Sequence, residues 1–128
     1  MTLDDVYKKC KCWMFEKNSS TIYNNNIVEI ANQKLAELFE ENNMCRMFNG
    51  LAPLTEIPQV TSLNDNLTEL GIMEEYQLEV LPLGIDAEFL MDDDLNKMSR
   101  FDVKYYNARM AHQKFVSQDR IKKLLENN

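Results

Sequence analysis

Residues 73–91 read MEEYQLEVLPLGIDAEFLM, and they carry the clearest helical pattern in the chain. Their apolar side chains recur at spacings of three and four residues, which places them on one face of a helix. Pro82 and Gly84 lie inside this stretch, and proline cannot donate the backbone hydrogen bond that a continuous helix requires. We therefore predict a helix that kinks or restarts at Pro82. The apolar stripe consists of Met73, Tyr76, Val80, Leu83, Ala87 and Leu90.

A second pattern of the same period follows over residues 95–125. It predicts a long amphipathic helix in which His112, the single histidine, is a hydrogen-bonded core residue. The residues after about Ser117 are mostly polar, so we predict one helical domain over residues 1–116 and a mobile tail over residues 117–128. The stripe of this helix consists of Leu95, Met98, Phe101, Tyr105, Ala108, His112 and Phe115.

Two more helices are predicted in the N-terminal part of the chain. Residues 3–16 have apolar side chains at helical spacing. Residues 18–26 read NSSTIYNNN and have no apolar period, so they are predicted to form a loop. Asn26 and Glu29 then have the spacing of a capping box, with asparagine in place of the usual serine or threonine. This spacing predicts the start of a helix over residues 27–41.

The region between the two halves of the chain behaves differently. Pro53 and Pro58 prevent a continuous helix over residues 44–64, which predicts a long extended excursion or a β-hairpin near residues 50–64. Its apolar side chains would be exposed on a loop, so we expect them to contact a neighbouring subunit. On this hypothesis deletion of residues 50–64 leaves a folded monomer, whereas a loop packed across its own helices is the alternative. The expected contact residues are Leu54, Ile57 and Val60.

Composition agrees with a mostly α fold. The chain of 128 residues has only three glycines and three prolines, which leaves few residues for the tight turns of an all-β fold. Asparagine is expected to take over much of the turn chemistry. We predict a mostly α protein, a helical bundle of about four helices with the excursion or hairpin described above.

The net charge of −7 argues against a protein that binds nucleic acid through its phosphates. An acidic wall instead suits a surface that DNA passes without sticking, because it offers the phosphates no ion pairs. No apolar run approaches the roughly 18 residues of a spanning helix, so no membrane association is expected.

No constellation of residues predicts an enzyme. Cys45 and His112 could be drawn as a nucleophile and its base, but Cys45 has no flanking nucleophile signature. The run Asp92, Asp93 and Asp94 lacks the spacing of a calcium loop and is better explained as helix N-capping. The three cysteines are expected to be free thiols. We assign no catalytic residue, no cofactor and no metal.

Three segments taken in order resemble a known family. Residues 57–67 read IPQVTSLNDNL, residues 80–94 read VLPLGIDAEFLMDDD, and residues 101–107 read FDVKYYN. This order is similar to that of the head-to-tail connector proteins of tailed bacteriophages, also called adaptor or head-completion proteins. The resemblance covers roughly residues 54–107. It departs from the family at Leu83, where an aromatic residue is frequent, and this leaves open which branch of the family is meant.

The resemblance implies a virion structural protein without catalytic residues. Its subunits would form a homo-oligomeric ring, a dodecamer, beneath the portal protein, with a downstream tail or neck protein on the other side. DNA would pass through the channel without specific binding. The protein would lie in the neck of the virion and, before assembly, in the host cytoplasm. The tail would dock on the portal through Arg120, Ile121, Leu124 and Leu125.

A function of another class remains open on the residues alone. The same acidic helical domain would suit a cytoplasmic protein-interaction or regulatory module that acts as a monomer or small oligomer. Formation of a ring with a portal protein would favour the connector, and a small oligomer indifferent to any portal would favour the module.

Overall fold

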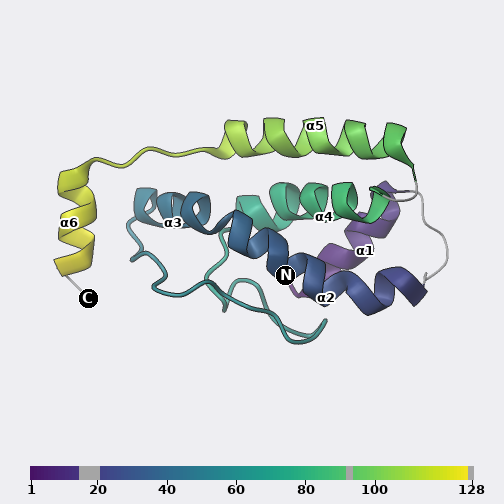
Figure 1. The fold of residues 1–128 in the computed structure, drawn as a ribbon. Helices are drawn as coiled ribbons and strands as arrows, with labels where there is room; N and C mark the ends of the chain where they lie inside the picture. The colour runs from purple at the N-terminus through teal and green to yellow at the C-terminus, as the bar shows by residue number, and fades with distance from the viewer. Residues whose placement is uncertain (15–20, 92–93, 127–128) are drawn as a thin grey trace.

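The computed structural model describes residues 1–14, 21–91 and 94–126, and its regular structure within these ranges is helical (Figure 1). The predicted mostly α fold is therefore confirmed. The β-hairpin alternative is not, since the described ranges contain no named strand and a single bridge between Thr2 and Asn66. The elements are α1 (Leu3–Trp13), α2 (Thr21–Glu37), α3 (Phe39–Phe48), the π-helix η1 (Tyr76–Val80), α4 (Leu81–Leu90), α5 (Leu95–His112) and α6 (Gln118–Glu126).

Helix α4 is the centre of the protein. Nine of its ten residues are buried, because α1, α2 and α5 all pack against it. A helix that is apolar on all sides is stable only in such an environment. The predicted stripe of residues 73–91 is confirmed from Tyr76 to Leu90, where every member is buried, and Met73 packs on the edge of the core.

The helix does not restart at Pro82, because residues 74–90 are helical throughout and only the winding changes, from π to α at Leu81. The five-residue π-helix η1 comes first, and the Leu81 N–H donates to the Tyr76 carbonyl oxygen five residues earlier. Pro82 then lies in the first turn of α4.

The predicted loop over residues 18–26 is wrong where the structure describes it. Helix α2 begins at Thr21, where Asn24 and Asn25 are exposed while Tyr23 and Ile27 enter the core. Burial of this apolar face overrides the weak helix propensity of asparagine. The helix predicted over residues 27–41 is broken at Leu38 and continues as α3 to Phe48. Helix α1 ends at Trp13, and the expectation for residues 15 and 16 lies outside the described residues.

Residues 51–72 form the long excursion, and three asparagine side chains hold its backbone in place. Asn32 donates to the Val60 carbonyl oxygen (3.0 Å) and accepts from the Val60 N–H (2.7 Å). Asn43 makes the same pair of bonds with Leu54 (3.1 and 2.7 Å). Asn42 bonds the carbonyl oxygen of Gly71 (3.0 Å) and the N–H of Met73 (2.9 Å). We call Asn32, Asn42 and Asn43 the asparagine clamps.

Asn32 and Asn43 each do for one backbone position what a neighbouring strand would do in a sheet, and Asn42 does so for two positions. We expect Asn43→Ala to lower the free energy of unfolding by about 1–2 kcal/mol, because it leaves both backbone groups of Leu54 without a protein partner. Urea unfolding measures this loss. Asn25→Ala, at an exposed position of α2, is the control and should not destabilise the protein. Equal stability of the two variants would contradict the role given to the clamp.

The C-terminal helix predicted over residues 95–125 is two helices. Phe101, Tyr105 and Ala108 of α5 are buried as predicted, but Leu95 is 65% exposed and Phe115 is 77% exposed. Helix α5 has eighteen residues against ten in α4, so its ends extend past the surface that supports it. The chain then runs extended through residues 113–117 before α6 begins (Figure 1).

Candidate interaction surfaces

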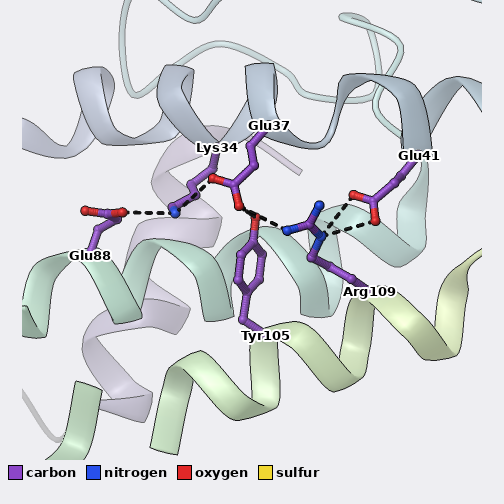
Figure 2. A network of polar contacts seen from close by, with 6 residues as sticks. All are labelled: Lys34, Glu37, Glu41, Glu88, Tyr105 and Arg109. Atoms are coloured by element: carbon purple, nitrogen blue, oxygen red, sulfur yellow. Dashed lines mark hydrogen bonds and ion pairs between the residues drawn. The ribbon is translucent and has the colours of Figure 1, made fainter. Parts of the chain in front are cut away.

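A network of charged side chains fixes α5 on the bundle (Figure 2). The buried Lys34 ammonium lies 3.2 Å from a Glu37 carboxylate oxygen and 3.1 Å from Glu88. The Tyr105 hydroxyl donates to Glu37 (3.1 Å), and Arg109 pairs with the same carboxylate at 3.1 Å. Arg109 also bonds both carboxylate oxygens of Glu41 at 3.1 Å. The network joins α2 and α3 to α4 and α5, so the outer face of α5 is held in one orientation.

That outer face carries exposed apolar side chains. Leu95, Val103, Tyr106 and Met110 are each more than half exposed and fall on one side of α5. Figure 1 shows α5 at the rim of the bundle with no other element beyond it. Exposed apolar side chains that share a face mark interaction surfaces more often than scattered ones do. We call these four residues the α5 outer stripe.

The C-terminal arm, residues 113–126, extends away from the bundle (Figure 1). No residue of α6 is buried. The arm touches α3 where the Arg120 guanidinium donates to the Phe48 carbonyl oxygen (3.0 Å) and where the Lys114 ammonium lies 5.1 Å from the Phe48 ring centre. The predicted docking residues Ile121, Leu124 and Leu125 share one face of α6. The arm carries four basic and two acidic residues in an acidic chain: Lys114, Arg120, Lys122, Lys123, Asp119 and Glu126.

The three residues predicted to contact a neighbouring subunit differ in how far they are exposed. Val60 is 2% exposed and belongs to the core, so its assignment as a contact residue is wrong. The clamp at Asn32 turns it inward. Leu54 is half-buried near Gly71, and Ile57, 46% exposed, is the one of the three that is open to a partner. Deletion of residues 50–64 is accordingly expected to disrupt the core rather than to leave a folded monomer.

A groove of about 550 Å³ lies between α1 and α5, with α4 at its base. It combines aromatic walls with cations, an unusual pairing in a chain of net charge −7. Sequence reasoning missed this groove because its residues come from three helices. The spacing of Lys97, Arg100 and Lys104 on one predicted helix was the available signal. The groove is lined by Cys12, Trp13, Leu83, Lys97, Arg100, Phe101 and Lys104.

The residues considered for chemistry have structural partners. The Cys45 thiol donates to a Glu75 carboxylate oxygen (3.1 Å), and burial raises the Cys45 pKa to about 12, which disfavours the thiolate. The half-buried His112 pairs with Glu79 at 3.2 Å. Asp94 caps α5 by accepting from the Lys97 N–H (3.1 Å), as predicted, whereas Asp92 and Asp93 lie outside the described residues. Among the described residues, no cluster of three or more histidine, cysteine or acidic side chains could hold a metal ion.

None of the helices within the described ranges has the length and apolar character of a membrane-spanning segment. Comparison of the chain with protein-family models, curated proteins and solved structures gives no match. Three surfaces of the described residues are candidates for contact with a partner: the α5 outer stripe, the C-terminal arm and the α1–α5 groove.

Proposed function

We propose that this chain is a structural, non-catalytic subunit of the head-to-tail connector of a tailed bacteriophage. The observation that carries the proposal is the C-terminal arm, an amphipathic helix without a buried residue that is attached through an extended segment. Such a helix buries little apolar surface against its own bundle and can bury its apolar face against a partner. The resemblance of residues 54–107 to connector proteins indicates the portal as that partner.

The α5 outer stripe supports assembly into a ring. A stripe held rigidly by the Lys34–Arg109 network presents the same apolar surface in every copy. In a closed ring each subunit uses two different surfaces, one toward each neighbour. The stripe is a candidate for one of them, and the resemblance implies twelve subunits in the ring.

The charge distribution fits a channel protein of this kind. The body carries a net negative charge, so it repels DNA phosphates on average, and DNA would pass without specific binding. The basic residues of the arm instead favour an acidic protein surface. The proposed site of action is the virion neck, between the portal and a tail or neck protein, with assembly from subunits in the host cytoplasm.

Removal of the arm tests the proposal. A chain ending at Ser117 should lose binding to the portal while its thermal midpoint stays within a few degrees of the full chain, because α6 buries no residue. Electron microscopy of each chain with and without portal measures ring formation, and differential scanning calorimetry measures stability.

Leu125→Ser with Leu124→Ser is the finer variant, since it keeps the charges of α6 and removes part of its apolar face. Gln118→Ser, at an exposed and uncharged position of α6, is the matched control and should retain most of the binding. Full binding by the chain ending at Ser117 would contradict the proposal. A stable small oligomer that ignores the portal would favour the cytoplasmic interaction module instead.

A further inference from the structure

We propose that residues 55–57 of one protomer dock in the α1–α5 groove of a second copy of the chain. The Glu56 carboxylate would pair with Arg100 and Lys104, and the Ile57 side chain would enter between the aromatic walls. The inference rests on the proposed function in one respect, since it supplies a subunit contact for the ring. Its own basis is the match between two surfaces of the structure.

The groove suits an apolar side chain with a carboxylate at the neighbouring position. Trp13 and Phe101 supply apolar walls, and Leu83 forms the base. Arg100 is exposed and makes no ion pair or hydrogen bond with any of the described residues. Lys104 is also exposed, with its ammonium 5.6 Å from the centre of the Phe101 ring. A carboxylate placed between these two cations would replace water on both.

Residues 55–57 present the complementary pair. Glu56 and Ile57 are adjacent and both exposed, so a carboxylate and an apolar side chain are open to a partner at neighbouring positions. The segment bends at residues 55 and 56, and the clamps of Asn43 at Leu54 and Asn32 at Val60 hold it on both sides. A segment ordered before binding loses little conformational entropy when it docks.

The two surfaces lie on opposite sides of the protomer. Figure 1 shows the excursion along one side of the bundle and α5 along the other. A segment on one side that fits a groove on the other cannot close a two-fold dimer through that contact alone. It generates a head-to-tail series of copies, which closes as a ring when the rotation per subunit permits.

The exposed native thiol of Cys12 lines the groove and gives a direct test, since Cys10 and Cys45 are buried. Thr55→Cys places a second thiol beside Glu56 and leaves both docking residues intact. A short bismaleimide should then link Cys12 of one copy to position 55 of the next. We expect a ladder of covalent dimers, trimers and larger species on denaturing gels, both for the concentrated chain and for the chain bound to portal.

Two controls define the result. Cys12→Ser combined with Thr55→Cys should abolish the ladder, and Glu29→Cys, on an exposed position of α2, should give none. A product that stops at the dimer, or no product in either sample, overturns the inference. Rings on the portal without a ladder would overturn this contact and leave the proposed function standing. A ladder without portal binding would support this contact and count against the proposed function.

Charge reversal is the second measurement and needs no cross-linker. Arg100→Glu with Lys104→Glu should weaken self-association at least tenfold in sedimentation experiments. Adding Glu56→Lys to that variant should restore most of the association, because both partners of the contact then change sign. Glu29→Lys in place of Glu56→Lys should not restore it. Loss without specific rescue would overturn the pairing.

Discussion

Asp86→Asn is expected to stabilise the protein by about 2–4 kcal/mol at pH 7. Asp86 is 0% exposed in the middle of α4, and neither of its carboxyl oxygens has a hydrogen-bond partner among the described residues. Burial raises its pKa from 3.8 to about 8, against a smaller opposing effect of the Cys10 thiol. The folded protein therefore keeps this carboxyl protonated at pH 7, whereas the unfolded chain ionises it.

The sign of the pH dependence follows from these two pKa values. Between about pH 4 and pH 8 the folded state binds one proton more than the unfolded state at this group, so stability falls as the pH rises. The slope approaches about 1.4 kcal/mol per pH unit. The pKa values of Asp5 and Asp65 are lowered by hydrogen bonds from the Thr2 and Thr61 backbone amides, so their contributions are lost only as the pH falls below about 4.

Urea unfolding at pH 5, 6, 7 and 8 measures the effect. The natural chain should lose stability across this series, and Asp86→Asn should lose much less, because an amide does not ionise. Asp102→Asn, at an exposed position of α5, is the control and should keep the slope of the natural chain. Parallel pH series for the natural chain and Asp86→Asn would show that Asp86 is not the group responsible.

Gly84→Val is expected to destabilise the protein by about 3 kcal/mol. A Cβ at position 84 would lie 2.7 Å from Cε1 and 3.0 Å from Cζ of the Tyr105 ring, and 3.2 Å from Cδ of Lys34. The ring cannot turn away easily, since the Tyr105 hydroxyl bonds Glu37. Helix α5 would have to move off α4, and the network in Figure 2 would lose its alignment.

Thermal or urea unfolding of Gly84→Val measures this loss. Ala36→Val, at an exposed position of α2, is the matched control and should cost only the few tenths of a kcal/mol of valine in a helix. In a Tyr105→Ala background, Gly84→Val should cost markedly less than in the natural chain, because the clashing ring is gone. An equal cost in both backgrounds would mean that the helix crossing does not depend on Gly84.

The parts of the fold that the sequence predicts are those governed by a strong local period. The α4 stripe and the buried residues of α5 follow from apolar spacing alone. Helix α2 starts earlier than predicted because Tyr23 and Ile27 reach the core, which asparagine propensity cannot reveal. The inward turn of Val60 depends on Asn32, far away in sequence, and so escapes any local pattern.

The interaction surfaces also differ in how far the sequence predicts them. The apolar face of α6 could be predicted from the spacing of Ile121, Leu124 and Leu125. The separation of α6 from α5 could not, because residues 113–117 continue an acceptable helical pattern. The α1–α5 groove requires the packing of three helices, and the sequence alone gives only the cationic spacing on α5.

The asparagine clamps also limit the chemical lifetime of the protein. Asparagine is among the thermolabile residues, and hydrolysis of its side-chain amide leaves a carboxylate that accepts hydrogen bonds but donates none. At Asn42, which is 2% exposed, the product would be a buried charge beside the Gly71 carbonyl oxygen, where the amide had donated. Warm storage is therefore expected to release the excursion slowly from α2 and α3. An aged sample would then behave like a variant with aspartate in place of a clamp asparagine, although its gene is unchanged.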